Sequence, residues 1–160
     1  MIIASGSSIE EVLIERILKC TNLNLILYFS NKKELDKYQN NDRITAIEGN
    51  VLKTQALTDA MESADIIYAN LSGIDRGAKT KSILVAMDQT NKTRVILFDT
   101  SKNEDALYES INLLDRFGID HTEIQPNLSI NQNEDLTEMS LAKIADDVIQ
   151  RILNRDSFKY

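Results

Sequence analysis

The feature that most constrains the fold is a regular alternation of short apolar runs and amphipathic segments along the chain. Runs rich in Ile, Leu, Val and Tyr predict six β-strands, at residues 1–5, 23–29, 43–49, 64–71, 94–99 and 119–126. Apolar stripes at helical spacing lie between and after them: Ile9, Val12, Leu13 and Ile17; Leu57, Ala60 and Met61; Ile83, Leu84 and Met87; Leu107, Ile111 and Leu114; and a last stripe from Leu141 to Ile152. Strands that alternate with helices require right-handed crossovers. The sequence therefore predicts an α/β fold, a three-layer doubly wound parallel sheet of order 3-2-1-4-5-6.

Several predicted helices carry end signals. Ser8 and Glu11 have the spacing of a capping box, in which the hydroxyl and the carboxylate each accept from a free backbone N–H. Ser140 precedes the last stripe, with Met139 placed as a hydrophobic staple. Gly118 follows the fifth helix as a C-cap. The only cysteine, Cys20, ends the first helix and is expected to pack.

Composition narrows the functional class. The 160 residues fit a single domain spanning 1–160, without repeats or an obvious linker. A net charge of −7 argues against a nucleic-acid partner, and no apolar run reaches the roughly 20 residues of a membrane helix. One cysteine and the lack of an export signal favour a reducing cytoplasm. The single histidine, His121, has no companion with metal-ligand spacing, so no metal site is expected.

The turn after the first strand carries the main functional signal. A helix N-terminus offers free N–H groups and partial positive charge, which suit a pyrophosphate. Gly6 lets the backbone approach a ligand closely, and the neighbouring serines can donate hydrogen bonds. Glu10 opposes this role, because its carboxylate competes for the positive potential and adds bulk. The turn is thus either a weakened phosphate site or only a capped strand–helix turn.

Other stretches bear on this choice. They are ASGSSIEEVLIERIL, LILYFSNKKEL, IEGNVLKTQAL, ADIIYANLSG, FGIDHTEIQPN and MSLAKIADDVIQRIL, in this order. Together they resemble the NmrA-like, atypical short-chain dehydrogenase family of NAD(P)-binding, Rossmann-fold proteins. The resemblance runs from residue 1 to about residue 154.

The resemblance implies a site for NADP or NAD. The residues that match its cofactor-binding motifs are Ser5, Gly6, Ser7, Ser8, Ile9, Ser30, Asn31, Asn50, Val51, Asn70, Leu71 and Ser72. Ser30 stands where NADP-preferring relatives usually have an arginine, although Lys32 and Lys33 follow it. Asn50 replaces an aspartate on the adenine side. With a glycine also missing from the turn, dinucleotide binding is expected to be weak or lost.

Catalytic groups of the wider family are incomplete. Its members use a tyrosine with a lysine four residues later, which lowers the tyrosine pKa, and a serine. Thr100 or Ser101 falls in the serine region. If Tyr108 is the tyrosine, the lysine position holds Asn112; in another alignment register the lysine position holds Glu109. We therefore assign no catalytic residue and expect Tyr108 to be a packing or surface side chain. The short loops at 100–103 and 128–137 predict that the substrate lobe is reduced or absent.

Two functional hypotheses follow. The first is an NAD(P)-binding, oxidoreductase-family protein with weak or lost catalysis. The second is a non-catalytic dinucleotide sensor or protein-interaction module. In either case the short loops would leave apolar surface uncovered, which favours a homodimer.

Overall fold

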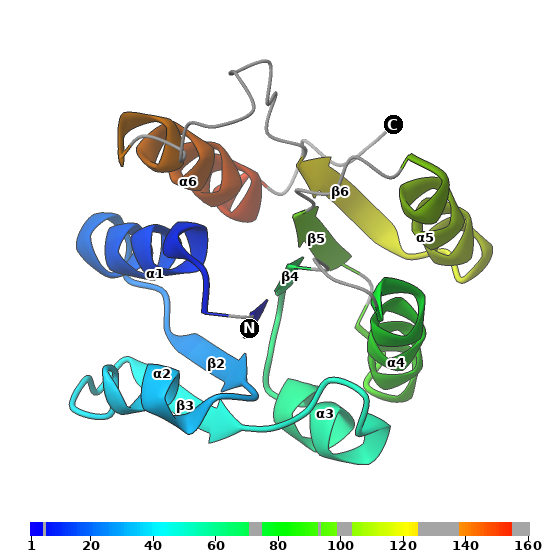
Figure 1. Cartoon of the computed structure of the whole chain (residues 1–160), viewed down its shortest axis with the longest axis horizontal. Helices are drawn as coiled ribbons and strands as arrows, with labels where there is room; N and C mark the ends of the chain where they lie inside the picture. The colour runs from blue at the N-terminus through cyan, green and yellow to red at the C-terminus, as the bar shows by residue number, and fades with distance from the viewer. Residues whose placement is uncertain (5, 71–74, 93, 99–103, 125–137, 155–160) are drawn as a thin grey trace.

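The computed structural model describes the chain except for residues 5, 71–74, 93, 99–103, 125–137 and 155–160. Within the described residues, six strands form one sheet (Figure 1). They are β1 (Ile2–Ala4), β2 (Leu25–Phe29), β3 (Ile44–Glu48), β4 (Ile67–Asn70), β5 (Arg94–Phe98) and β6 (Asp120–Ile124). Each strand lies inside the apolar run that predicted it.

The sheet order is β3-β2-β1-β4-β5-β6, and every neighbouring pair is parallel. The predicted doubly wound fold is confirmed. Ile2 of β1 pairs with Leu27 of β2 and with Tyr68 of β4, so β1 is central. The strand order reverses between β1 and β4, and in open parallel sheets ligands bind beyond the carboxyl ends of the strands at this point. The turn after β1 therefore lies beside the end of β4.

Helices cover both faces of the sheet. They are α1 (Ser8–Cys20), α2 (Lys32–Asp36), α3 (Thr54–Met61), α4 (Arg76–Gln89), α5 (Glu104–Arg116) and α6 (Glu138–Leu153). Helices α1, α2 and α6 pack on one face, and α3, α4 and α5 on the other (Figure 1). Ile2 and Ile3 belong to different cores because successive strand residues point to opposite faces.

The helix ends are partly as predicted. Gly118 has φ +63°, and the Ile119 N–H donates to the Leu114 carbonyl at 3.0 Å, so the C-cap of α5 is confirmed. The Met139 staple is wrong, because α6 begins earlier, at Glu138, and leaves Met139 70% exposed within its first turn. For the same reason Ser140 is inside the helix and is not its N-cap.

Cys20 ends α1 as predicted, but its thiol is exposed. The packing role expected for it is wrong. The buried stripe of α1 ends at Ile17, and Cys20 falls outside it.

Candidate functional site

The turn between β1 and α1 has the backbone that a close ligand approach requires. Gly6 has φ +83°, a backbone conformation that residues with a Cβ rarely adopt. The N-terminus of α1 begins two residues later, at the carboxyl edge of the sheet. Ser5 lies outside the described residues. The sequence-predicted position of the turn is thus in place, at the point where the strand order reverses.

The first turn of α1 is capped in a different register from the one expected. The predicted Ser8–Glu11 capping box is wrong, because Ser7 is the N-cap and Ser8 is already helical. The Ser7 N–H donates to Glu10 Oε2 at 2.6 Å, so Glu10 is the residue that reaches back. Glu11 instead binds Lys37 Nζ at 2.6 Å.

Glu10 points inward and is 0% exposed. Besides the Ser7 N–H, its carboxylate accepts a hydrogen bond from Asn70 Nδ2, at 2.6 Å from Oε1. Asn70 is the last residue of β4 and is itself buried. The first turn of α1 and the end of β4 are therefore joined by a buried carboxylate. That carboxylate already faces the positive end of the α1 dipole.

The predicted adenosine-side residues lie at the same edge of the sheet. Ser30 and Asn31 follow β2, and Asn50 and Val51 follow β3, its parallel neighbour. The Asn31 amide oxygen caps α2, and that of Asn50 accepts from the Leu52 N–H at 2.9 Å. Both asparagines therefore hold their turns in shape. Val51 packs against the core under α3 and α4.

The other predicted residues divide into two groups. Ile9 is 4% exposed and fills the core under α1, so its side chain faces away from the turn. Leu71 and Ser72 lie outside the described residues, as do Thr100 and Ser101. Within the described part of the strand-four motif, Asn70 lies beside the first turn of α1.

Two features of this edge were missed by the sequence analysis. Glu34 of α2 lies over Gly6, where an added Cβ would come within 2.9 Å of Glu34 Cγ. Arg76, the first residue of α4, is only 5% exposed although it carries a guanidinium. No local pattern distinguishes either residue from an ordinary helix-surface charge. Their positions come from the packing of α2 and α4 against the sheet.

The candidate catalytic tyrosine lies on α5. Tyr108 is 68% exposed on the outer surface of α5, in agreement with the expected surface role. His121 stands on the edge strand β6, with Nδ1 3.2 Å from the Ile119 carbonyl oxygen. In the described residues no group of three or more His, Cys, Asp or Glu could hold a metal ion. No described helix combines the length and apolarity needed to cross a bilayer.

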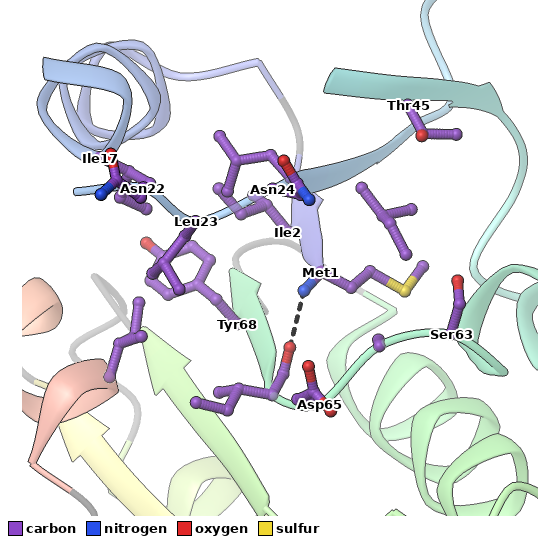
Figure 2. A pocket seen from close by; sticks show the side chains of 15 residues that line it. Met1, Ile2, Ile17, Asn22, Leu23, Asn24, Thr45, Ser63, Asp65 and Tyr68 are labelled. Atoms are coloured by element: carbon purple, nitrogen blue, oxygen red, sulfur yellow. Dashed lines mark hydrogen bonds between the residues drawn. The ribbon is translucent and has the colours of Figure 1, made fainter. Parts of the chain in front are cut away.

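A cavity of about 540 Å³ lies at the opposite, amino edge of the strands (Figure 2). The Met1 amine donates to the Ile66 carbonyl there, at 2.6 Å. Burial lowers the pKa of this amine to about 6, against a smaller opposing effect of Asp65. Tyr68 also lines the cavity, and its ring extends from β4 toward Asn22 (Figure 2). Its buried hydroxyl has no hydrogen-bond partner among the described residues, and burial raises its pKa well above the usual value.

Comparison with solved structures supports the fold. A Rossmann-fold NAD(P)-binding protein from Shigella flexneri is 20% identical with a TM-score of 0.76, covering 98% of this chain and 87% of that one. A wide-type short-chain dehydrogenase/reductase from Veillonella parvula, solved in complex with NADP, is 17% identical with a TM-score of 0.78, covering 97% and 87%. A nucleoside-diphosphate-sugar epimerase from Staphylococcus aureus is 14% identical with a TM-score of 0.79, covering 99% and 67%.

No curated protein matches the sequence. The profile of a family described as NAD(P)H-binding matches residues 8–125, from the first residue of α1 to just beyond β6. That range is most of the chain and contains five of the six strands. The chain therefore belongs to this family of NAD(P)H-binding, Rossmann-fold domains.

Proposed function

We propose that this protein binds a nicotinamide dinucleotide weakly, across Gly6 to Ile9, with the adenosine end toward Ser30, Asn31, Asn50 and Val51. The family match, the sheet order and the position of Gly6 support this placement. In this orientation the pyrophosphate meets the N-terminus of α1, and the nicotinamide end passes Asn70.

The observation that carries the weak binding is the buried carboxylate of Glu10. It already accepts the Ser7 N–H and the Asn70 amide, so these donors are not available to a pyrophosphate. Like charges about 6 Å apart repel by roughly 3 kcal/mol at an effective dielectric constant near 20. Full burial of Glu10 limits the relief that solvent screening gives. A dinucleotide must therefore displace Glu10 or bind beside it at a cost.

For activity, we propose an oxidoreductase-type relative of the NmrA-like branch in which catalysis is weak or lost. The exposed position of Tyr108, and Asn112 or Glu109 in the lysine position, support this. We also propose that residues 1–160 act as one dinucleotide-binding domain with a reduced substrate lobe.

A second candidate is a dinucleotide sensor or protein-interaction module. Exposed apolar side chains at Leu52, Val85 and Phe117 favour it, since such groups can be buried by a partner or in a homodimer. The acidic net charge supports a protein or dinucleotide partner over nucleic acid, and the single cysteine supports a cytoplasmic location.

The test is calorimetric titration with NADH and NADPH of the wild type, Glu10→Gln and Glu10→Gly. Glu10→Gln keeps the shape and the Ser7 acceptor but removes the charge, and Glu10→Gly also removes the bulk. Glu15→Gln is the matched control, because Glu15 is an exposed carboxylate on the same helix, paired with Lys19. We expect millimolar binding by the wild type and the control, and about tenfold tighter binding by Glu10→Gly.

Tight wild-type binding that Glu10→Gly leaves unchanged would contradict the role of Glu10. If no variant binds either dinucleotide, the binding proposal fails and the interaction module remains. Incubation with NADH or NADPH and simple quinones or carbonyl compounds tests catalysis separately. Turnover that survives Tyr108→Phe would show that chemistry occurs without this tyrosine.

A further inference from the structure

Glu34 lies between the two parts of the proposed dinucleotide site. Its side chain covers Gly6, since a Cβ there would be 2.9 Å from Glu34 Cγ and 3.2 Å from Cδ. Its backbone N–H donates to the Asn31 carbonyl at 3.1 Å, in the segment expected to meet the adenosine ribose. The group that joins the pyrophosphate to the adenine is this ribose. A dinucleotide lying along the proposed path therefore places its ribose against Glu34.

The carboxylate of Glu34 is held in place. Lys37 Nζ donates to Glu34 Oε2 at 2.7 Å and to Glu11 Oε1 at 2.6 Å. The Glu34 side chain is 23% exposed, so it is partly shielded from water. Two carboxylates sharing one ammonium leave this group with a net negative charge. Burial and then the charge of Glu11 raise the pKa of the nearby Tyr38 hydroxyl, and Glu34 and Glu10 act in the same direction.

Among the described residues, neither lysine that directly follows β2 forms an ion pair with Glu34, whose ammonium partner is Lys37. Lys32 lines a hollow between α2 and β3 together with Ile44 and Glu48, which is a different surface from the Gly6 turn. Lys33 is exposed in the first turn of α2. Ser30, at the end of β2, offers a hydroxyl and no positive charge.

We infer that Glu34 makes the site select NADH over NADPH. A carboxylate can accept hydrogen bonds from the 2′- and 3′-hydroxyls of an unmodified ribose. A 2′-phosphate at the same place would carry nearly two negative charges, which the negative charge of Glu34 would repel. It also lacks the 2′-hydroxyl that could donate a hydrogen bond to the carboxylate. This inference rests on the proposed dinucleotide function and names the cofactor that the same site takes.

The experiment measures NADH and NADPH affinity by calorimetry in the Glu10→Gly background, where both ligands are expected to bind. Added to it are Glu34→Gln, which removes the charge, and Glu34→Lys, which inverts it. Glu62→Gln is the matched control, because Glu62 is an exposed carboxylate just after α3, far from the Gly6 turn. We expect about tenfold preference for NADH in the background and the control, a ratio near one in Glu34→Gln, and preference for NADPH in Glu34→Lys.

The outcomes separate the inference from the proposed function. Binding of both ligands with equal affinity, or an NADH preference that Glu34→Gln leaves unchanged, overturns the role of Glu34 and leaves the dinucleotide site standing. Binding of neither ligand in any variant overturns both. The adenosine half is checked with 5′-ADP and 2′,5′-ADP, which lack the nicotinamide end. Stronger binding of 2′,5′-ADP by the background protein would also contradict the inference.

Discussion

Charged side chains stabilise both ends of helix α1, which lie at opposite edges of the sheet. The two ends differ in the sign of the charge and in the groups that surround it. At its N-terminus, Glu10 accepts hydrogen bonds from the Ser7 N–H and the Asn70 side-chain amide. At its C-terminus, Arg43 donates to the carbonyls of Ile17 and Leu18. A carboxylate at the first end and a guanidinium at the second both complement the helix dipole.

The two ends of α1 also differ in the described groups that lie beside them. At the carboxyl edge, polar groups from α1, α2 and β4 converge and pair with one another. At the amino edge, the cavity is lined by Met1, whose amine is buried, and by Tyr68, whose hydroxyl has no hydrogen-bond partner among the described residues. The site proposed for a ligand lies at the carboxyl edge, and the cavity beside Met1 lies on the opposite side.

The largest expected effect tests how tightly the carboxyl edge is packed. In Gly49→Ala, the new Cβ would lie 2.2 Å from Tyr28 Cζ, and Tyr28 is 1% exposed and cannot swing outward. We expect a loss of about 3 kcal/mol in the free energy of unfolding, measured by urea denaturation. Gly77→Ala is the control, because no atom lies within 4 Å of its added Cβ in α4. It should be stabilising by about 0.5–1 kcal/mol, and equal effects at the two glycines would contradict this account of the packing.

The second effect concerns the buried amine at the amino edge, in a chain that begins at Met1. Its pKa is about 6 in the folded protein, against 8.0 for the same amine in an unfolded chain. Between these values the unfolded chain binds the proton and the folded protein does not, so stability falls as the pH falls from about 8 to about 6. The expected loss is about 2–3 kcal/mol, measured by denaturation at several pH values.

Asp65→Asn provides the companion measurement. Because the Asp65 charge raises the amine pKa, its removal should lower that pKa further and enlarge the loss of stability on acidification. A free energy of unfolding that stays constant between pH 6 and 8 would show that the amine is hydrated, and the contrast between the two edges would then weaken.

The smallest effect compares two buried tyrosines. The Tyr28 hydroxyl donates to the Asn50 carbonyl at 3.3 Å, whereas the Tyr68 hydroxyl has no partner among the described residues. Tyr28→Phe should therefore destabilise the protein by about 0.5 kcal/mol. Tyr68→Phe should leave stability unchanged or raise it by up to about 1 kcal/mol, because it removes a buried polar group without a hydrogen bond. Thermal and urea unfolding of both variants measure the signs, and a clear loss in Tyr68→Phe would contradict the description of the amino edge.

Much of the fold could be predicted because its signals are local. Apolar runs of five to eight residues marked every strand within a few residues of its bounds, and the stripes from Ile9 to Ile17 and from Leu57 to Met61 marked the buried sides of α1 and α3. Alternation of strands and helices then left few topologies, since parallel strands need right-handed crossovers. Helix starts were less certain. Ser7 and not Ser8 is the N-cap of α1, and its N–H donates to Glu10 and not to Glu11.

The sequence predicted where the candidate site lies in the fold. The contacts of its charged side chains depend on the tertiary structure. The sequence located the turn at Gly6 and raised the question of Glu10, but it left open whether that carboxylate faces solvent. Asn70, 60 residues away along the chain, settles the direction by donating to it. Glu34 over Gly6 and the burial of Arg76 have the same origin, because each depends on packing between distant segments. Periodicity records which side of an element is apolar, whereas a buried charge is placed by partners that only the folded chain brings within hydrogen-bonding distance.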